Sequence, residues 1–367
     1  MTIDPAIYDL YLRARSPLGG LTGSPDEAQS ARSLELLDAV TAVAPTFARA
    51  WAELAMRRAV CIRRFDGAGF PGLTLATAPA AAETALRLDP GLGLPHQALS
   101  YLAPVAAYAE RETLHRRALT ASPHDPEVLN LAGQFYAEVG RLTEALECAR
   151  KAAELDPLYW PAAQWRAGLL GALGRHDEAR ILWDACLARW PDVEALAGEA
   201  IADAANAEDW DRLEDLAEAA FRRGLDSPRL QAFTQAQRDR RTLRPDILEA
   251  HRQQVAASFA RDGRASLADL AKLVALGAAD EAFDYAARAS FAHMFEPGAP
   301  LQAGAWAPAV IFVAANRRMS ADRRFVPLCA RMGLVDYWTR SGHWPDCADD
   351  AALGYEFRAE CRAVAAH

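Results

Sequence analysis

The stretch PEVLNLAGQFYAEVGRLTEALECARKAAELDPLY, residues 126–159, decides the fold of this chain. Its first half repeats apolar residues at helical spacing until Gly140-Arg141, which interrupts that spacing as a turn does. The second half resumes the helical spacing and stops at Pro157, because proline cannot continue a helix. Both halves carry small residues, which allow two helices to approach closely: Ala132, Gly133, Ala145, Ala149 and Ala152. The stretch therefore predicts two antiparallel helices joined by a tight turn.

The same unit recurs along the chain. Pro90, Pro123, Pro157 and Pro191 lie 33, 34 and 34 residues apart, and each closes a helix-favouring stretch. A period of this length is typical of a helical solenoid, in which each repeat packs against its neighbours. The period therefore predicts a stack of helical hairpins in place of one compact core.

These residues and spacings resemble the tetratricopeptide repeat (TPR). The resemblance implies an all-α fold, a right-handed helical solenoid (α-α superhelix) with a C-terminal helical cap. Under this interpretation residues 1–225 form the TPR-like solenoid, residues 226–292 continue the helical hairpins, and residues 293–367 form the cap.

One repeat is longer than the others. Pro45 and Pro90 are 45 residues apart, and the excess falls in residues 63–72, where three glycines and a proline oppose helix formation. We expect a loop here that projects from the stack. Two interpretations of Phe65 and Phe70 stay open: they form an apolar arm that a partner covers, or they fold back onto the first repeats.

Composition limits the function classes. The net charge is −9 and the chain has two lysines, Lys151 and Lys272, which argues against direct nucleic-acid binding by this chain. The stretch Arg238–Arg244 is an exception that fits an anionic partner or a solvated connection between repeats. No apolar run is long enough to span a membrane, and the N-terminus lacks the pattern of a signal peptide.

The source and compartment follow from composition too. Arginine and alanine are abundant, which indicates a bacterial protein encoded by GC-rich DNA. The six cysteines have no paired spacing and are expected to be reduced, buried thiols of a cytoplasmic protein.

The two ends carry a narrower resemblance. Residues 8–15 and 324–346 resemble the TPR half of bacterial winged-helix transcriptional regulators and of cyclase-linked TPR proteins. The chain contains neither a winged helix nor a cyclase domain, so the resemblance implies a regulatory or sensor half, or a relative without an effector. The sequence carries no signal for an oligomeric state.

Motifs of catalysis are absent from the sequence. It lacks the P-loop, dinucleotide, zinc-protease and hydrolase signatures, so we expect no enzyme, no catalytic residues and no cofactor. His343 and Cys347 lie four residues apart, but Trp344-Pro345 between them opposes a regular helix. We therefore expect a structural turn there and no metal site.

The expected binding surface is the groove formed by the first helix of each repeat. Counting along the repeat, the predicted partner-binding residues are Arg49, Met56, His96, Ser100, Asn130, Gln134, Gln164 and Trp165. They predict a non-enzymatic scaffold that binds a protein or peptide. The alternative is a small-molecule sensor, in which the tryptophan-rich centre around Pro157 to Pro191 and the cap near Trp306, Tyr337 and Trp338 enclose an apolar ligand.

Overall fold

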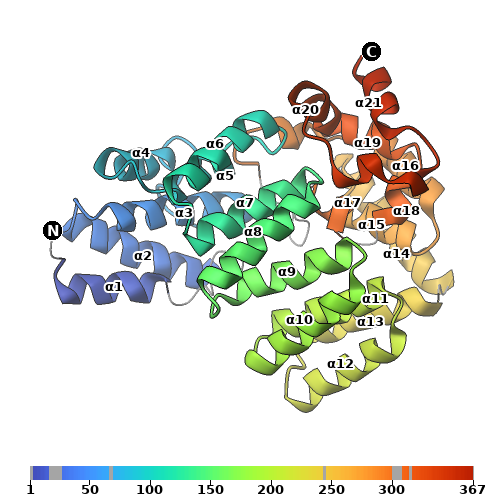
Figure 1. The fold of residues 1–367 in the computed structure, drawn as a ribbon, viewed down its shortest axis with the longest axis horizontal. Helices are drawn as coiled ribbons and strands as arrows, with labels where there is room; N and C mark the ends of the chain where they lie inside the picture. The colour runs from blue at the N-terminus through green and yellow to red at the C-terminus, as the bar shows by residue number, and fades with distance from the viewer. Residues whose placement is uncertain are drawn as a thin grey trace. The chain divides into compact units, whose positions relative to one another are not determined.

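A computed structural model describes residues 3–15, 27–65, 69–242, 245–299, 308–313 and 316–366. Every regular element in these ranges is a helix, as predicted (Figure 1). The α-helices of the repeats are α1 Pro5–Arg15, α2 Glu27–Val43, α3 Ala48–Phe65, α4 Pro79–Leu88, α5 Leu94–Leu102, α6 Tyr108–Ala121, α7 Pro126–Glu138, α8 Leu142–Leu155, α9 Trp160–Ala172, α10 His176–Arg189, α11 Glu194–Asn206, α12 Trp210–Arg222, α13 Pro228–Thr242, α14 Pro245–Asp262, α15 Leu267–Ala275 and α16 Ala279–Arg288. The later, shorter helices are η2 Ala292–Phe295, α17 Val310–Val313, α18 Asn316–Ser320, α19 Phe325–Arg331, α20 Leu334–Ser341, η3 Asp346–Asp349, η4 Ala351–Leu353 and α21 Phe357–Ala365.

The chain forms two compact units. Unit 1 comprises residues 1–135, 151–161 and 292–303, and unit 2 comprises residues 136–150, 162–291 and 304–367. In unit 1 consecutive helices pair, and α3 also packs against α5, the first helix of the next pair. In unit 2 α11 packs in the same way against α12 and α13, and α15 pairs with α16. Each unit is therefore built from sequential helical hairpins.

The turns between paired helices repeat with the predicted period. Gly140 and Gly174 take the left-handed conformation, with φ of 80° and 77°. Beyond each glycine the next amide reaches back to the helix, from Arg141 N to Tyr136 O and from Arg175 N to Leu170 O, each at 2.8 Å. Glu208 occupies the next position of the series and keeps this conformation, with φ of 58°. The 34-residue period thus extends past Pro191, where the sequence pattern weakens.

The second helices end where the prolines predicted. Helices α4, α6, α8 and α10 each end two residues before a proline, respectively Pro90, Pro123, Pro157 and Pro191. At two of these ends an aspartate precedes the proline, and its carboxylate accepts the amide of Gly91 or Leu158 at 2.9 Å. A local rule, the exclusion of proline from a helix interior, therefore sets the repeat boundary.

The segment that was expected to project as a loop, residues 63–72, packs within unit 1 where the structure describes it. Residues 63–65 belong to the last turn of α3, and residues 66–68 lie outside the described ranges. Phe70 is 6% exposed and packs in the core of unit 1. The half-buried ring of Phe65 lies against it, with ring centroids 5.7 Å apart. Burial of two aromatic rings outweighs the flexibility of the glycines, so neither ring forms a projecting arm.

The C-terminal helices add to unit 2. Helices α19, α20 and α21 pack on one another, α19 packs on α16, and α17 and α18 pack on α15. The indole N–H of Trp338 donates to the Val139 carbonyl at 3.0 Å, and the Thr143 amide donates to the Asp346 carboxylate at 2.7 Å. These helices therefore cover both the last hairpin and the turn that joins α7 to α8.

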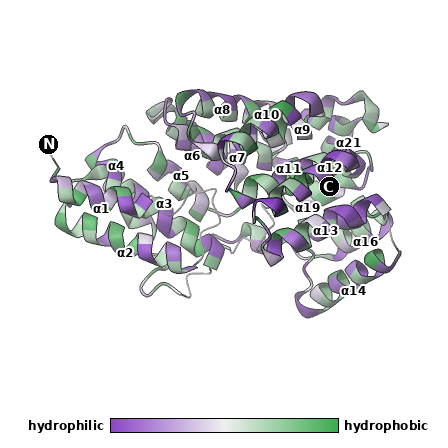
Figure 2. Cartoon of the chain, turned by 90° about the horizontal axis from the view of Figure 1, so that it is seen from below, coloured by the Kyte–Doolittle hydropathy of each residue, from purple (hydrophilic) through white to green (hydrophobic). Residues whose placement is uncertain are grey.

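The helices of the chain are amphipathic. Figure 2 shows hydrophilic and hydrophobic residues together on each visible helix. Within the described ranges we find no helix with the length and apolar composition needed to cross a bilayer.

Candidate functional site

Polar side chains recur at matching positions of three first helices in unit 1. Two residues, four positions apart, come from each of α3, α5 and α7, so each pair lies on one face of its helix. We call the six residues the polar ladder: Glu53, Arg57, Gln97, Tyr101, Asn130 and Gln134. Five of them are at most 5% exposed, and Tyr101 is half-buried. Polar side chains are seldom buried this completely, which makes the ladder a candidate site.

Hydrogen bonds connect the ladder from helix to helix. Gln97 Nε2 donates to the Val128 carbonyl of α7 at 2.7 Å. The Tyr101 hydroxyl donates to Gln134 Oε1 at 3.5 Å, and Asn130 Nδ2 donates to the Tyr159 hydroxyl at the same distance. Each amide therefore uses one of its two ends within the protein.

The other ends of the amides are unpaired. Gln97 Oε1, Asn130 Oδ1 and Gln134 Nε2 are buried and have no hydrogen-bond partner among the described residues. The same holds for Nε and Nη1 of Arg57. A buried donor or acceptor without a partner costs about 1–3 kcal/mol, so several in one place need an explanation.

Charged groups lie beside the ladder. Arg15 of α1 forms ion pairs with Glu53 through Nε at 2.7 Å and with Glu127 of α7 through Nη2 at 3.5 Å. Burial, and next the nearby Glu53 carboxylate, raise the pKa of Glu127. Burial, followed by the Glu127 charge, also raises the pKa of Tyr159 well above its usual value. Buried carboxyl groups and arginines therefore lie together beside the amides of the ladder.

The sequence prediction found part of the ladder. Asn130 and Gln134 are members of it. His96 and Ser100 are not, because the α5 prediction is one residue out of phase: the observed pair is Gln97 and Tyr101. The Ser100 hydroxyl instead bonds with His115 Nε2 of α6 at 3.0 Å, inside the hairpin.

The spacing of the prolines already indicated which residues of α5 occupy the ladder positions. Pro90 and Pro123 are 33 residues apart, and counting back 33 from Asn130 gives Gln97, whereas a period of 34 gives His96. On α3 the predicted residues lie outside the ladder: Met56 is fully buried in the core and Arg49 is exposed, while Glu53 and Arg57 are the ladder residues of this helix. The insertion between Pro45 and Pro90 removes the regular period that would have placed them. A role for Arg49 and Met56 in partner binding stays a prediction.

Gln164 and Trp165 lie on α9, are both half-buried and belong to unit 2. Gln164 lies 34 residues after Asn130, so it occupies the same position of the next repeat in the sequence. A role for these two residues in partner binding stays a prediction.

Two of the tryptophans that suggested an apolar pocket pack in the interior. Trp183 is 1% exposed, and Trp338 is fully buried with its indole N–H paired. Tyr337 is also buried, and its hydroxyl accepts from Arg141 Nη1 at 3.3 Å. Four other tryptophans are half-buried, Trp160, Trp165, Trp190 and Trp210, and Trp306 lies outside the described residues.

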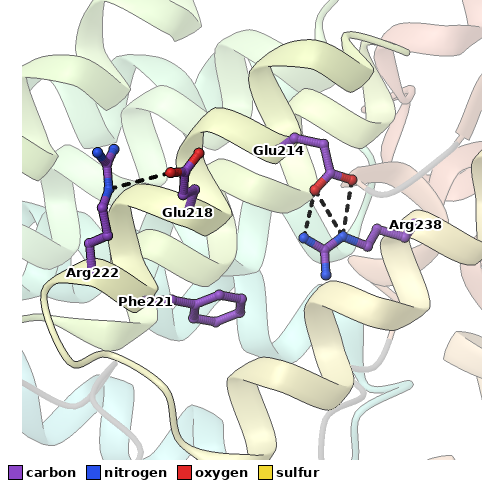
Figure 3. A pocket seen from close by; sticks show the side chains of 5 residues that line it. All are labelled: Glu214, Glu218, Phe221, Arg222 and Arg238. Atoms are coloured by element: carbon purple, nitrogen blue, oxygen red, sulfur yellow. Dashed lines mark hydrogen bonds and ion pairs between the residues drawn. The ribbon is translucent and has the colours of Figure 1, made fainter.

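One hollow occurs between α12 and α13 of unit 2 and is shown in Figure 3. It measures about 460 Å³ and is lined by Glu214, Glu218, Phe221, Arg222 and Arg238. Its charges pair with one another, Arg238 with Glu214 at 2.6 Å and Arg222 with Glu218 at 3.8 Å. The ion pairs leave the hollow without an unpaired group that selects a ligand.

Within the described part of the chain, no group of three His, Cys, Asp or Glu side chains is arranged to hold a metal ion. His343 precedes η3, and Cys347 lies within it.

Comparison with known proteins finds similarity to solved helical-repeat structures at low sequence identity. No family model matches the chain, and no curated protein matches it. Among solved structures, YrrB, described as a TPR protein with an unusual peptide-binding site, is 17% identical, with a TM-score of 0.37 over 54% of this chain and 96% of that one. A human IFIT1 dimer with PPP-AAAA is 16% identical, with a TM-score of 0.42 over 70% and 67%. A TPR protein from Parabacteroides merdae is 14% identical, with a TM-score of 0.33 over 77% and 90%.

The helix pairing defines the class: the chain is an all-α protein made of sequential helical hairpins.

Proposed function

We propose that unit 1 binds an extended segment of a partner protein along the polar ladder. The observation that carries the proposal is the set of buried amide ends without partners on two successive first helices, α5 and α7. An amide side chain can donate and accept, as a peptide backbone can, so it binds an extended chain without requiring one side-chain sequence.

The spacing of the helices fits such a segment. Packed helices lie about 8–10 Å apart, and an extended chain advances about 3.3 Å per residue. Each step from one first helix to the next therefore corresponds to about three peptide residues, and the two steps from α3 to α7 correspond to about five to six residues. Gln97, Asn130 and Gln134 would then meet backbone groups at regular intervals.

We also propose a cellular role for this binding. The chain acts as a non-enzymatic scaffold in the regulatory or sensor part of a bacterial signalling or transcription-control system. This rests on the resemblance of residues 8–15 and 324–346 to such regulators. The effector would then be a separate domain or chain that responds when the ladder is occupied.

A peptide-binding experiment tests the proposal. Random nonapeptides displayed on phage are selected on the purified chain, and the selected peptides are labelled with fluorescein. We expect Asn130→Ala/Gln134→Ala to weaken binding on the order of tenfold or more, because two hydrogen bonds of about 1 kcal/mol each are lost. Gln231→Ala/Gln253→Ala, which removes two exposed amides, is the matched control.

Circular dichroism of both variants confirms that the helices are intact. If no peptide is enriched, or if the ladder variant binds as tightly as the control, the ladder is not the binding site.

A further inference from the structure

The least satisfied group of the whole ladder is the guanidinium of Arg57. This residue is 3% exposed, and its Nε and Nη1 have no hydrogen-bond partner among the described residues. Its neighbours Glu53 and Glu127 are both engaged by Arg15 instead. Burial lowers the pKa of Arg57. The nearby carboxyl groups of Glu53 and Glu127 raise it, but by less.

A buried guanidinium without a partner is costly because arginine stays protonated at any physiological pH. Replacement by a neutral residue is expected to stabilise a protein that has no further use for the charge. The arrangement points to a partner that the free chain does not contain.

The surrounding charges select the kind of partner. Arg15 pairs with Glu53 and Glu127, while Nε and Nη1 of Arg57 have no hydrogen-bond partner among the described residues. A carboxylate can accept two hydrogen bonds from such a guanidinium and matches its single charge. A phosphate dianion would bring a second negative charge toward the nearby carboxyl groups of Glu53 and Glu127.

We propose that Arg57 binds the carboxylate of an Asp or Glu side chain in the peptide segment taken up by unit 1. This inference rests on the proposed function and adds the chemistry of one peptide position. The peptide supplies its backbone to Gln97, Asn130 and Gln134 and one acidic side chain to Arg57.

The test uses the selected nonapeptides with acetylated and amidated ends, so that side chains supply the carboxylates. Each Asp or Glu is replaced in turn by Asn or Gln. We expect one replacement to weaken binding to the natural chain on the order of tenfold or more. In Arg57→Gln the acidic peptide and its amide form should bind with equal affinity.

Arg58→Gln is the matched control. Arg58 is the next residue on α3 but pairs on the surface with Asp38, at 2.9 Å. This variant should keep the full preference for the acidic peptide. A preference that survives in Arg57→Gln overturns the inference and leaves peptide binding standing. Absence of any selected peptide overturns both proposals.

Thermal unfolding without peptide gives a second readout. Because Arg57→Gln removes an unpaired buried charge, we expect its Tm to rise by about 2–4 °C. A merely structural arginine would stabilise the free protein, and its loss would lower Tm. A lower Tm would therefore show that the guanidinium is satisfied in the free chain and would overturn the inference.

Discussion

At the scale of single residues, His115 shows how the fold controls protonation. The imidazole is 1% exposed, bonds with the Ser100 hydroxyl and stacks on Phe135 with ring centroids 4.8 Å apart. Burial, and next the charge of Arg111, lower the pKa of His115 to about 3. The neutral imidazole is thus part of the interior of the α5 and α6 hairpin.

The pKa of His115 predicts a loss of stability in acid. An unfolded histidine has a pKa of about 6.5, so between this value and about 3 the unfolded chain binds the extra proton. The stabilisation is complete above pH 6.5 and declines as pH falls through this range. At pH 4.5 it should have declined by about 2–3 kcal/mol.

Urea unfolding at pH 7 and pH 4.5 measures this change. His115→Gln should lose less stability on acidification than the natural chain, because glutamine does not titrate. The exposed residue His124 supplies the control, and His124→Gln should keep the full pH dependence. Equal acid sensitivity of all three proteins would contradict the prediction.

At the scale of elements, the turn between α7 and α8 connects local and distant interactions. Gly140 ends α7 with a φ of 80°, and a Cβ placed on it would lie 2.7 Å from Cβ of Pro345. The Asp346 amide donates to the Gly140 carbonyl at 2.9 Å. Glycine is therefore required at position 140 for two reasons: it adopts the left-handed conformation, and it leaves room for the close approach of the C-terminal segment.

Loss of the indole donor of Trp338 should weaken the contact between the cap and this turn. In Trp338→Phe the Val139 carbonyl loses its hydrogen bond, and we expect the free energy of unfolding to fall by about 1–3 kcal/mol. Hydrogen–deuterium exchange should become faster at residues 139–143.

Trp344→Phe is the matched control, because Trp344 belongs to the same segment but is half-buried and lies against Arg358 and Arg362. Unchanged exchange in Trp338→Phe, or the same increase in both variants, would mean that the indole bond does not hold the turn.

At the scale of the whole molecule, charge opposes nucleic-acid binding. The net charge is −9, and the arginines of residues 238–244 are partly engaged. Arg238 pairs with Glu214 at 2.6 Å, and Arg240 donates to Asn206 at 2.9 Å. Arg244 lies outside the described residues.

We expect no binding of a fluorescein-labelled DNA duplex at physiological salt, because the net negative charge of the chain opposes the approach of phosphates. Fluorescence anisotropy across a salt series checks this. Submicromolar, salt-dependent binding that disappears in Arg238→Gln/Arg241→Gln would overturn it.

The helical hairpins could be predicted from the sequence because local rules determine them. Proline excludes helix, glycine permits the left-handed turn, and both act on residues within one or two turns. These rules placed the ends of α4, α6, α8 and α10. Within the ladder they placed Asn130 and Gln134, which lie in the most regular repeat, but they were one residue out at Gln97 and did not place Glu53 and Arg57.

By itself, the sequence determined that this protein is a chain of paired helices with a 34-residue period. The tertiary structure alone decided which side chains are buried and which charges meet. Arg15 reaches Glu127 from another helix pair, and Trp338 reaches Val139 across 199 residues. Among the described residues Nε and Nη1 of Arg57 have no hydrogen-bond partner, while Arg15 pairs with both Glu53 and Glu127. Burial and pairing depend on groups that are distant in the chain, and no local pattern contains their positions.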